Sequence, residues 1–125
     1  MSIIGITTDF GNQGYFVPSM KGVILSINPE AKIVDITHQI PKHDIEKGDF
    51  VLANAVKTFP KNSTFLTVID PGVGTERDCI LIKTKNGFNF VGPDNGVFTT
   101  VTDSYGIEEI RKIDNEKVMR DKTSN

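Results

Sequence analysis

The sequence predicts an α/β protein with a three-layer, Rossmann-like arrangement, in which helices cover both faces of a mostly parallel sheet. Short runs rich in β-branched residues alternate with amphipathic stretches. Turn-forming residues separate these segments, and the first five follow the order strand, helix, strand, helix, strand with short connections. This order predicts parallel strands joined by right-handed crossovers.

The first strand and helix are defined by their hydrophobic patterns. Ile3–Thr8 is a short β-branched run that ends at an acid and a turn, which predicts a buried strand. From Tyr15 to Ile27, apolar residues recur at three- and four-residue steps, which indicates a helix with one buried face. Asn28-Pro29 ends this helix, and Lys32–Thr37 is predicted as the second strand.

The second helix is predicted over residues 45–58, where one broad face is mainly apolar. Asp44 precedes it and fits the N-cap position. Phe59-Pro60 ends this helix, and the β-branched run Thr64–Ile69 follows as the third strand. The strand–helix–strand–helix–strand unit is then complete.

The last third of the chain changes from a parallel to a hairpin pattern. Strands are predicted over Cys79–Lys85 and Phe88–Gly92, joined through Asn86-Gly87, a strong hairpin signal. A short helix over Val97–Tyr105 and a final strand over Ile107–Ile113 complete the predicted elements.

Length and composition indicate a single soluble domain. We expect an α/β domain over residues 1–113, followed by a polar tail over residues 114–125 without periodicity. The net charge of -2 gives no reason to expect nucleic acid or an anionic membrane as a partner. The single cysteine, Cys79, heads an apolar run, so we expect a buried, inert thiol in a reducing compartment.

Targeting signals are not expected either. Met1-Ser2 leads straight into the first strand without a basic leader, so we expect no signal peptide. No apolar segment approaches the length needed to span a membrane. We therefore expect a cytoplasmic protein.

Acids or turn residues lie at the exits of several predicted strands, namely Asp9, Asp35, Asp70 and the pair Asp94-Asn95. Ligands of α/β proteins collect outside the carboxyl ends of the strands, so several of these side chains could converge on one crevice. A carboxylate after the first strand is suited to accept both hydroxyls of a ribose. Asp9 could instead cap the N-terminus of the following helix, and both interpretations stay open.

The third predicted strand leads into Asp70-Pro71-Gly72-Val73-Gly74-Thr75-Glu76-Arg77. This glycine-containing loop can fold Arg77 back toward Asp70. Such a pair keeps the carboxylate ionised and can orient a water molecule or a polar substrate group. It could equally be a structural ion pair that braces a turn, and the spacing alone does not decide between the two.

The two histidines, His38 and His43, do not indicate a metal site, because no cysteine lies near them. For His38 we expect a hydrogen bond in the core or in a loop. His43 follows Lys42 and precedes Asp44 in a loop, so we expect a solvated surface position. No metal ligand is predicted.

Five blocks of the sequence together resemble a known family. They are Thr8-Asp9-Phe10-Gly11, Met20-Lys21-Gly22, Asp35-Ile36-Thr37-His38, residues 70–77 and Gly92-Pro93-Asp94-Asn95-Gly96. In this order they resemble the N-terminal domain of the S-adenosyl-L-methionine (SAM) hydrolases, also called SAM hydroxide adenosyltransferases. These enzymes are relatives of the fluorinases and chlorinases. The resemblance covers nearly the whole chain up to about residue 100.

The resemblance implies an enzyme in which water or hydroxide attacks C5′ of the ribose and releases adenosine and L-methionine, without a cofactor. In the family an Asp-Arg-His trio polarises the water, and Asp70 and Arg77 match its first two members. In the halide-using relatives a tyrosine stands where Asp70 is here, which favours water over halide as the nucleophile.

The resemblance also implies residues that bind the substrate. Asp9 matches the ribose-binding acid, and Phe10 belongs to the same block. His43 falls near a position that lines the substrate pocket in the halogenases. Asn95 lies in a family block near the site.

Two features of the family would lie beyond Asn125. The family's histidine belongs to a Thr-Phe-His-Gly-Arg-Asp block, which would begin about where the chain reaches Asn125. In the family a C-terminal β-barrel follows, and the site forms between neighbouring subunits of a trimer. We therefore expect this chain alone to be inactive. The alternative is a non-catalytic module that binds adenosine or SAM.

Overall fold

The computed structural model describes residues 3–69 and 78–113. The predictions for Asp70, Arg77 and the tail lie outside the described residues. The described part contains six strands: β1 (Ile3–Thr8), β2 (Lys32–Thr37), β3 (Thr64–Val68), β4 (Cys79–Thr84), β5 (Asn89–Pro93) and β6 (Ile107–Ile113). They form one sheet in the order β2-β1-β3-β5-β4-β6.

The sheet has a parallel and an antiparallel part. β1 pairs in parallel with β2 and with β3, and β3 pairs in parallel with β5. β4 pairs antiparallel with both β5 and β6. The hairpin predicted at Asn86-Gly87 is present, and Gly87 has a φ of 96°, a conformation that favours glycine.

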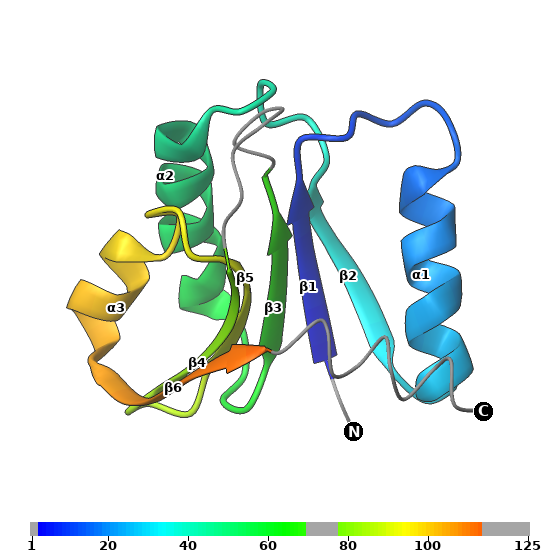
Figure 1. The fold of residues 1–125 in the computed structure, drawn as a ribbon. Helices are drawn as coiled ribbons and strands as arrows, with labels where there is room; N and C mark the ends of the chain where they lie inside the picture. Colours follow the sequence, from blue (N-terminus) through cyan, green and yellow to red (C-terminus); the bar gives the residue numbers. More distant parts are fainter. Residues whose placement is uncertain (1–2, 70–77, 114–125) are drawn as a thin grey trace.

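Helices lie on both sides of the sheet, as the sequence predicts. The helices are α1 (Phe16–Ile27), α2 (Ile45–Ala55) with a 3₁₀ turn η1 (Val56–Thr58), and α3 (Thr99–Tyr105). Figure 1 shows α1 on one side of the sheet and α2 and α3 on the other. Among the described residues, none of the helices has the length and apolar character needed to cross a membrane.

The hydrophobic core lies between the sheet and the helices α2 and α3. Phe65 stands at its centre, with its ring centroid 5.2 Å from those of both Phe88 and Phe90. Leu52 of α2 and Val101 of α3 are buried against the same cluster. These rings pack edge-to-face or stacked, the arrangements that aromatic pairs prefer, so they hold α2 and α3 firmly on the sheet.

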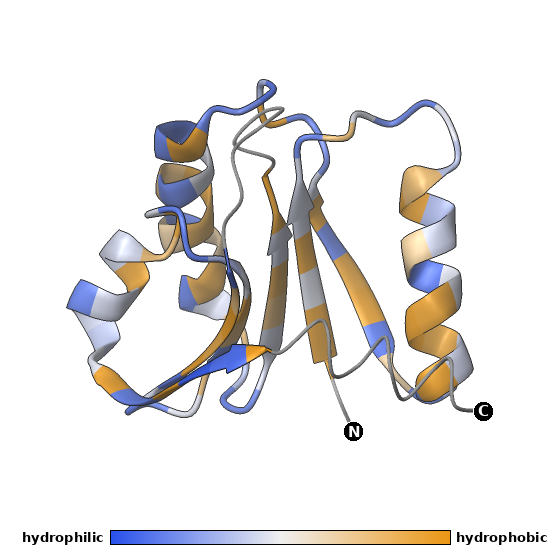
Figure 2. Ribbon diagram, in the orientation of Figure 1, coloured by the Kyte–Doolittle hydropathy of each residue, from blue (hydrophilic) through white to orange (hydrophobic). Residues whose placement is uncertain are grey.

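The prediction that α1 has one buried face is wrong in degree. No residue of α1 is fully buried, and Phe16, Val23 and Ile27 are largely exposed. Hydrophobic residues nevertheless recur along this helix, as the hydropathy colouring of Figure 2 shows. α1 connects β1 to β2, and β2 is the edge strand of the sheet, so α1 has less apolar surface to cover than α2 has.

Other expectations are met closely. β1, β2 and β6 have the predicted bounds, and Asp44 caps α2 by accepting a hydrogen bond from the Lys47 N–H at 3.0 Å. The expectation that Cys79 is buried is wrong in degree, because the residue is only partly buried; this partial burial still raises the pKa of its thiol. A raised pKa lowers the thiolate fraction, which agrees with an inert thiol.

One glycine sets how closely α2 approaches the sheet. A Cβ atom added to Gly48 would lie 2.1 Å from Cδ1 of Ile69 and 3.3 Å from Cγ2 of Val97. Ile69 and Val97 are both completely buried, so neither can move aside freely. The absence of a side chain at Gly48 therefore allows α2 to pack directly over the end of β3.

We expect Gly48→Ala to lower the free energy of unfolding, because overpacking costs about 1–3 kcal/mol and outweighs a helix-propensity gain of about 1 kcal/mol. Gly22→Ala in α1 is the matched control, since a Cβ there would meet no atom within 4 Å. This control should gain about 0.5–1 kcal/mol. Urea denaturation of both variants measures the difference, and equal effects would contradict close packing at Gly48.

Candidate functional site

Asp9 lies at the carboxyl end of β1 and is 5% exposed. Its Oδ2 accepts a hydrogen bond from the backbone N–H of His43 at 3.0 Å, and its own N–H donates to the carbonyl of Val68 at 3.3 Å. The capping interpretation is wrong, because α1 begins at Phe16, and its N-cap Tyr15 makes no side-chain cap hydrogen bond. Asp9 is instead a buried carboxylate at the edge of the parallel strands.

His43 presents its backbone N–H to Asp9 from the loop before α2. Its φ is 65°, in the left-handed region that residues other than glycine rarely adopt. Its side chain is exposed, as the sequence predicts for a loop position. A conformation of this kind costs about 1–3 kcal/mol, and such residues cluster at functional sites.

Asn95 connects the end of β3 to the loop before α3. Its Nδ2 donates to the carbonyl of Ile69 at 3.2 Å, and its Oδ1 accepts from the N–H of Val97 at 3.1 Å. Ile69 is the last described residue before Asp70. Asn95 therefore holds the backbone that leads into the predicted catalytic acid.

Phe10 follows Asp9 and is half-buried. Its ring centroid lies 5.7 Å from that of Phe16, and its N–H donates to Oγ1 of Thr8 at 3.2 Å. The structure thus brings Asp9, Phe10 and His43 together at the carboxyl ends of β1 and β2. Asn95 lies at the ends of β3 and β5.

His38 is buried and bonded on both ring nitrogens, which confirms the expected role in hydrogen bonding. Its Nδ1 lies 2.8 Å from Oγ1 of Thr8, and its Nε2 lies 2.7 Å from Oδ1 of Asp35. The second oxygen of Asp35 accepts from Nζ of Lys21 on α1 at 2.6 Å. We call this hydrogen-bonded series of side chains, Lys21–Asp35–His38–Thr8, the relay. No local sequence pattern joins all four residues, although the three-residue spacing between Asp35 near the end of β2 and His38 just after it is a usable signal.

The charges around Asp35 keep it ionised. The hydrogen bond from Lys21, helped by that from His38, holds the pKa of this carboxyl below its ordinary value, although burial opposes the shift. An ionised Asp35 can only accept hydrogen bonds. Within the described residues, no cluster of three or more His, Cys, Asp or Glu side chains could hold a metal ion.

The comparison with known families settles the assignment. The chain matches the profile of the SAM hydroxide adenosyltransferase N-terminal domain over residues 4–125. The chain belongs to this family. The match confirms the resemblance seen in the sequence, and the described mixed sheet is the N-terminal domain of the family.

Curated relatives of this chain are named as enzymes of two kinds. The (R)-S-adenosyl-L-methionine hydrolase of Methanocaldococcus jannaschii is 49% identical over 121 residues, which cover 94% of this chain and 46% of the relative. A fluorinase of Actinoplanes sp. is 28% identical over 139 residues, covering 94% of this chain and 47% of the enzyme. The chain therefore spans about half the length of the curated relatives it matches.

The fold is also found in solved structures. The crystal structure of an uncharacterised conserved protein from Thermotoga maritima superposes with a TM-score of 0.86 at 47% identity, over 91% of this chain and 44% of that one. A conserved hypothetical protein from Thermus thermophilus gives a TM-score of 0.83 at 30% identity, over 91% of this chain and 47% of that one.

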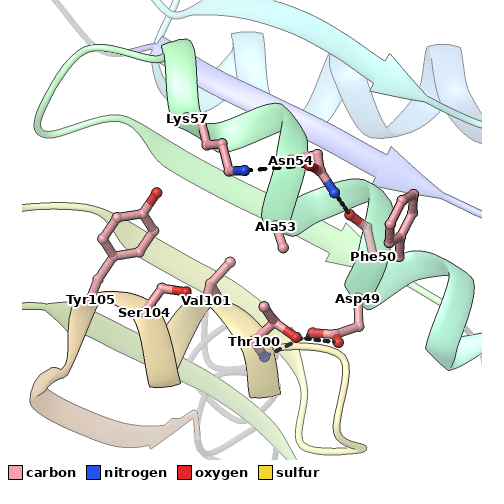
Figure 3. A pocket seen from close by; sticks show the side chains of 9 residues that line it. All are labelled: Asp49, Phe50, Ala53, Asn54, Lys57, Thr100, Val101, Ser104 and Tyr105. Atoms are coloured by element: carbon pink, nitrogen blue, oxygen red, sulfur yellow. Dashed lines mark hydrogen bonds between the residues drawn. The ribbon is translucent and has the colours of Figure 1, made fainter.

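The SAM hydroxide adenosyltransferase domain also has a groove between α2 and α3, of about 250 Å³. Figure 3 shows its lining, in which Asp49 of α2 bonds the N–H and the hydroxyl of Thr100 of α3 at 3.0 and 2.6 Å. None of the predicted site residues lines this groove. Asp49 and Thr100 join the two helices.

The lowered pKa of Asp35 predicts a pH-dependent contribution to stability. At a pH between the lowered pKa of folded Asp35 and its ordinary pKa, the unfolded state binds more protons than the folded state. The contribution of Asp35 to stability is therefore fully present above the ordinary aspartate pKa, and it is lost as the pH falls toward the lowered one. The gap in unfolding free energy between the wild type and Asp35→Asn should shrink from about pH 5 to about pH 3. We expect a gap of about 1 kcal/mol or less, because Asp35 is 44% exposed.

Urea denaturation at each pH measures this gap. In a Lys21→Met background, Asp35→Asn should change the unfolding free energy with a weaker dependence on pH, since the hydrogen bond from Lys21 is the largest cause of the lowered pKa of Asp35. A gap that is constant over this pH range would contradict the prediction.

Proposed function

We propose that the protein containing this domain hydrolyses SAM to adenosine and L-methionine, and that this domain binds the adenosine. The observation that carries the proposal is the buried carboxylate of Asp9, held by the backbone of His43 at the carboxyl ends of the parallel strands. In α/β folds this edge is where ligands bind. Support comes from the 49% identical relative, which is named as a SAM hydrolase.

Asp9 would bind the two hydroxyls of the ribose. A carboxylate is an acceptor with about four lone-pair sites, so it can bind several donors at once. The bond from the His43 N–H fixes the orientation of Asp9, and burial strengthens any hydrogen bond that it makes to the sugar. Phe10, His43 and Asn95 are proposed as further substrate-binding residues around this anchor.

The proposed reaction is an in-line displacement at C5′. A lone pair of the water oxygen forms the new C–O bond, and the C5′–S bond breaks with its electron pair going to sulfur, which leaves as neutral methionine. We propose that Asp70, held by Arg77, orients the water and takes up its proton, which then passes to solvent. Because the sulfonium is already a good leaving group, orientation of the nucleophile is the main requirement.

This mechanism needs no cofactor or metal. We further propose that the complete protein works in the cytoplasm as a homotrimer, with neither nucleic acid nor a membrane as a partner. We propose that the protein is not a halogenase despite the fluorinase relatives, because the resemblance places Asp70 where the halide-using enzymes of the family carry a tyrosine. When the full-length protein is incubated with SAM in buffer that contains fluoride or chloride, it should yield adenosine and no 5′-halogenated product.

Asp9→Ala in the full-length protein should weaken adenosine binding by about tenfold or more, because two hydrogen bonds to a charged group are lost. Isothermal titration calorimetry with adenosine and with 2′,3′-dideoxyadenosine isolates the ribose contribution. The wild type should prefer adenosine, and the variant should bind both equally. A preference that survives the substitution would restrict Asp9 to bracing the loop of His43.

Asp70→Asn in the full-length protein should lower the rate of SAM hydrolysis by about a hundredfold or more and leave adenosine affinity within about twofold. Chromatographic release of adenosine and methionine measures the rate, and calorimetry measures the affinity. Parallel loss of both would make Asp70 a structural residue. Adenosine binding without any turnover by the wild type would support the non-catalytic binding module.

A further inference from the structure

We propose that His38 is a positioning residue of the adenosine site, which holds the segment Asp9-Phe10-Gly11 in place through the relay. This inference deepens the proposed function and rests on the assignment of Asp9 to the ribose. His38 comes from the end of β2, whereas the segment that it holds follows β1. The two are joined by contacts that span about 30 residues of sequence.

His38 holds the segment at two points. Its carbonyl oxygen accepts the N–H of Gly11 at 2.6 Å. Its side chain bonds Oγ1 of Thr8 at 2.8 Å, and the same Oγ1 accepts the N–H of Phe10 at 3.2 Å. The residues on both sides of Asp9 are therefore fixed, directly or through one hydroxyl, by a single histidine.

The direction of the hydrogen bonds follows from the ionised Asp35. Because Asp35 can only accept, Nε2 of His38 must carry the proton that it donates. In the neutral imidazole Nδ1 is then an acceptor, so the hydroxyl of Thr8 donates to it. This leaves the lone pairs of Thr8 to accept the N–H of Phe10, and every bond in the relay has a consistent donor and acceptor.

Burial makes this arrangement selective for one geometry. Thr8 is completely buried and His38 is 6% exposed, whereas Lys21 and Asp35 lie at the surface end of the relay. A buried hydroxyl or imidazole that loses its partner is not rescued by water, so alternative conformations of the segment are disfavoured. His38 and Thr8 therefore fix the chain before and after Asp9, while the His43 N–H fixes the carboxylate itself.

The test uses Thr8→Val, which keeps the shape of the side chain and removes its hydroxyl, in the full-length protein. We expect adenosine affinity to fall about tenfold, with loss of the preference for adenosine over 2′,3′-dideoxyadenosine. Thr8→Ser, which keeps the hydroxyl, should retain the adenosine affinity and the preference for adenosine within about twofold of the wild type. A purely structural loss would weaken both ligands equally, and an unchanged preference in Thr8→Val would overturn the proposal.

Asp35→Asn provides a second variant at the exposed end of the relay, should Thr8→Val fail to fold. It should weaken the same preference, because an asparagine can turn its amide donor toward Nε2 and favour the other tautomer of His38. Asp49→Asn is the matched control, since it makes the same change to a carboxylate that bonds Thr100 outside the relay. It should leave adenosine binding unchanged.

A spectroscopic readout separates this proposal from the proposed function. In ¹⁵N-labelled protein, His38 should show a pyridine-like Nδ1 and a pyrrole-like Nε2, and Thr8→Val should shift the amide signals of Phe10 and Gly11. If adenosine does not bind the wild type but these signals appear, the proposed function fails and the positioning role stands. A protonated Nδ1 in neutral His38 would overturn the positioning role.

Discussion

The close packing of α2 on the end of β3 is the constraint on which the candidate site depends. Gly48 lets α2 pack against the buried side chain of Ile69, where any Cβ would lie 2.1 Å from Cδ1. The position of α2 fixes the loop directly before it, and in that loop His43 adopts a left-handed conformation. The N–H that His43 presents to Asp9 is therefore positioned by the hydrophobic core, through a helix that the aromatic cluster holds in place.

Several polar side chains are buried at the carboxyl ends of the strands, where apolar side chains would pack without loss of hydrogen bonds. Thr7, Thr8, Thr67, Asp9 and His38 are all buried there. Thr7 and Thr67 are register partners on β1 and β3, and their hydroxyls have no hydrogen-bond partner among the described residues. Each such group costs about 1–3 kcal/mol. Proteins accept costs of this kind mainly at functional sites, so this polarity agrees with the placement of the site at this edge.

Most of the fold could be predicted because its signals are local. β-branched runs bounded by turn residues define β1 and β2, Asn86-Gly87 defines a hairpin, and Asp44 caps a helix. Site geometry depends on contacts between distant residues, which no local pattern contains. The bond from His43 to Asp9 spans 34 positions, so Asp9 could not be distinguished from a helix cap by sequence alone. The depth of burial of α1 was mispredicted for a similar reason, since it depends on the partner surface as well as on the helix.

Asp9 is supported from two sides by interactions of different kinds. On one side, α2 is held by buried apolar contacts, which salt hardly affects. On the other side, the relay ends in the exposed pair Lys21–Asp35, and exposed pairs contribute about 1 kcal/mol or less. The strength of the relay must therefore lie in its buried members, His38 and Thr8. The surface pair mainly keeps Asp35 ionised, and this ionised group selects the tautomer through which His38 reaches Thr8.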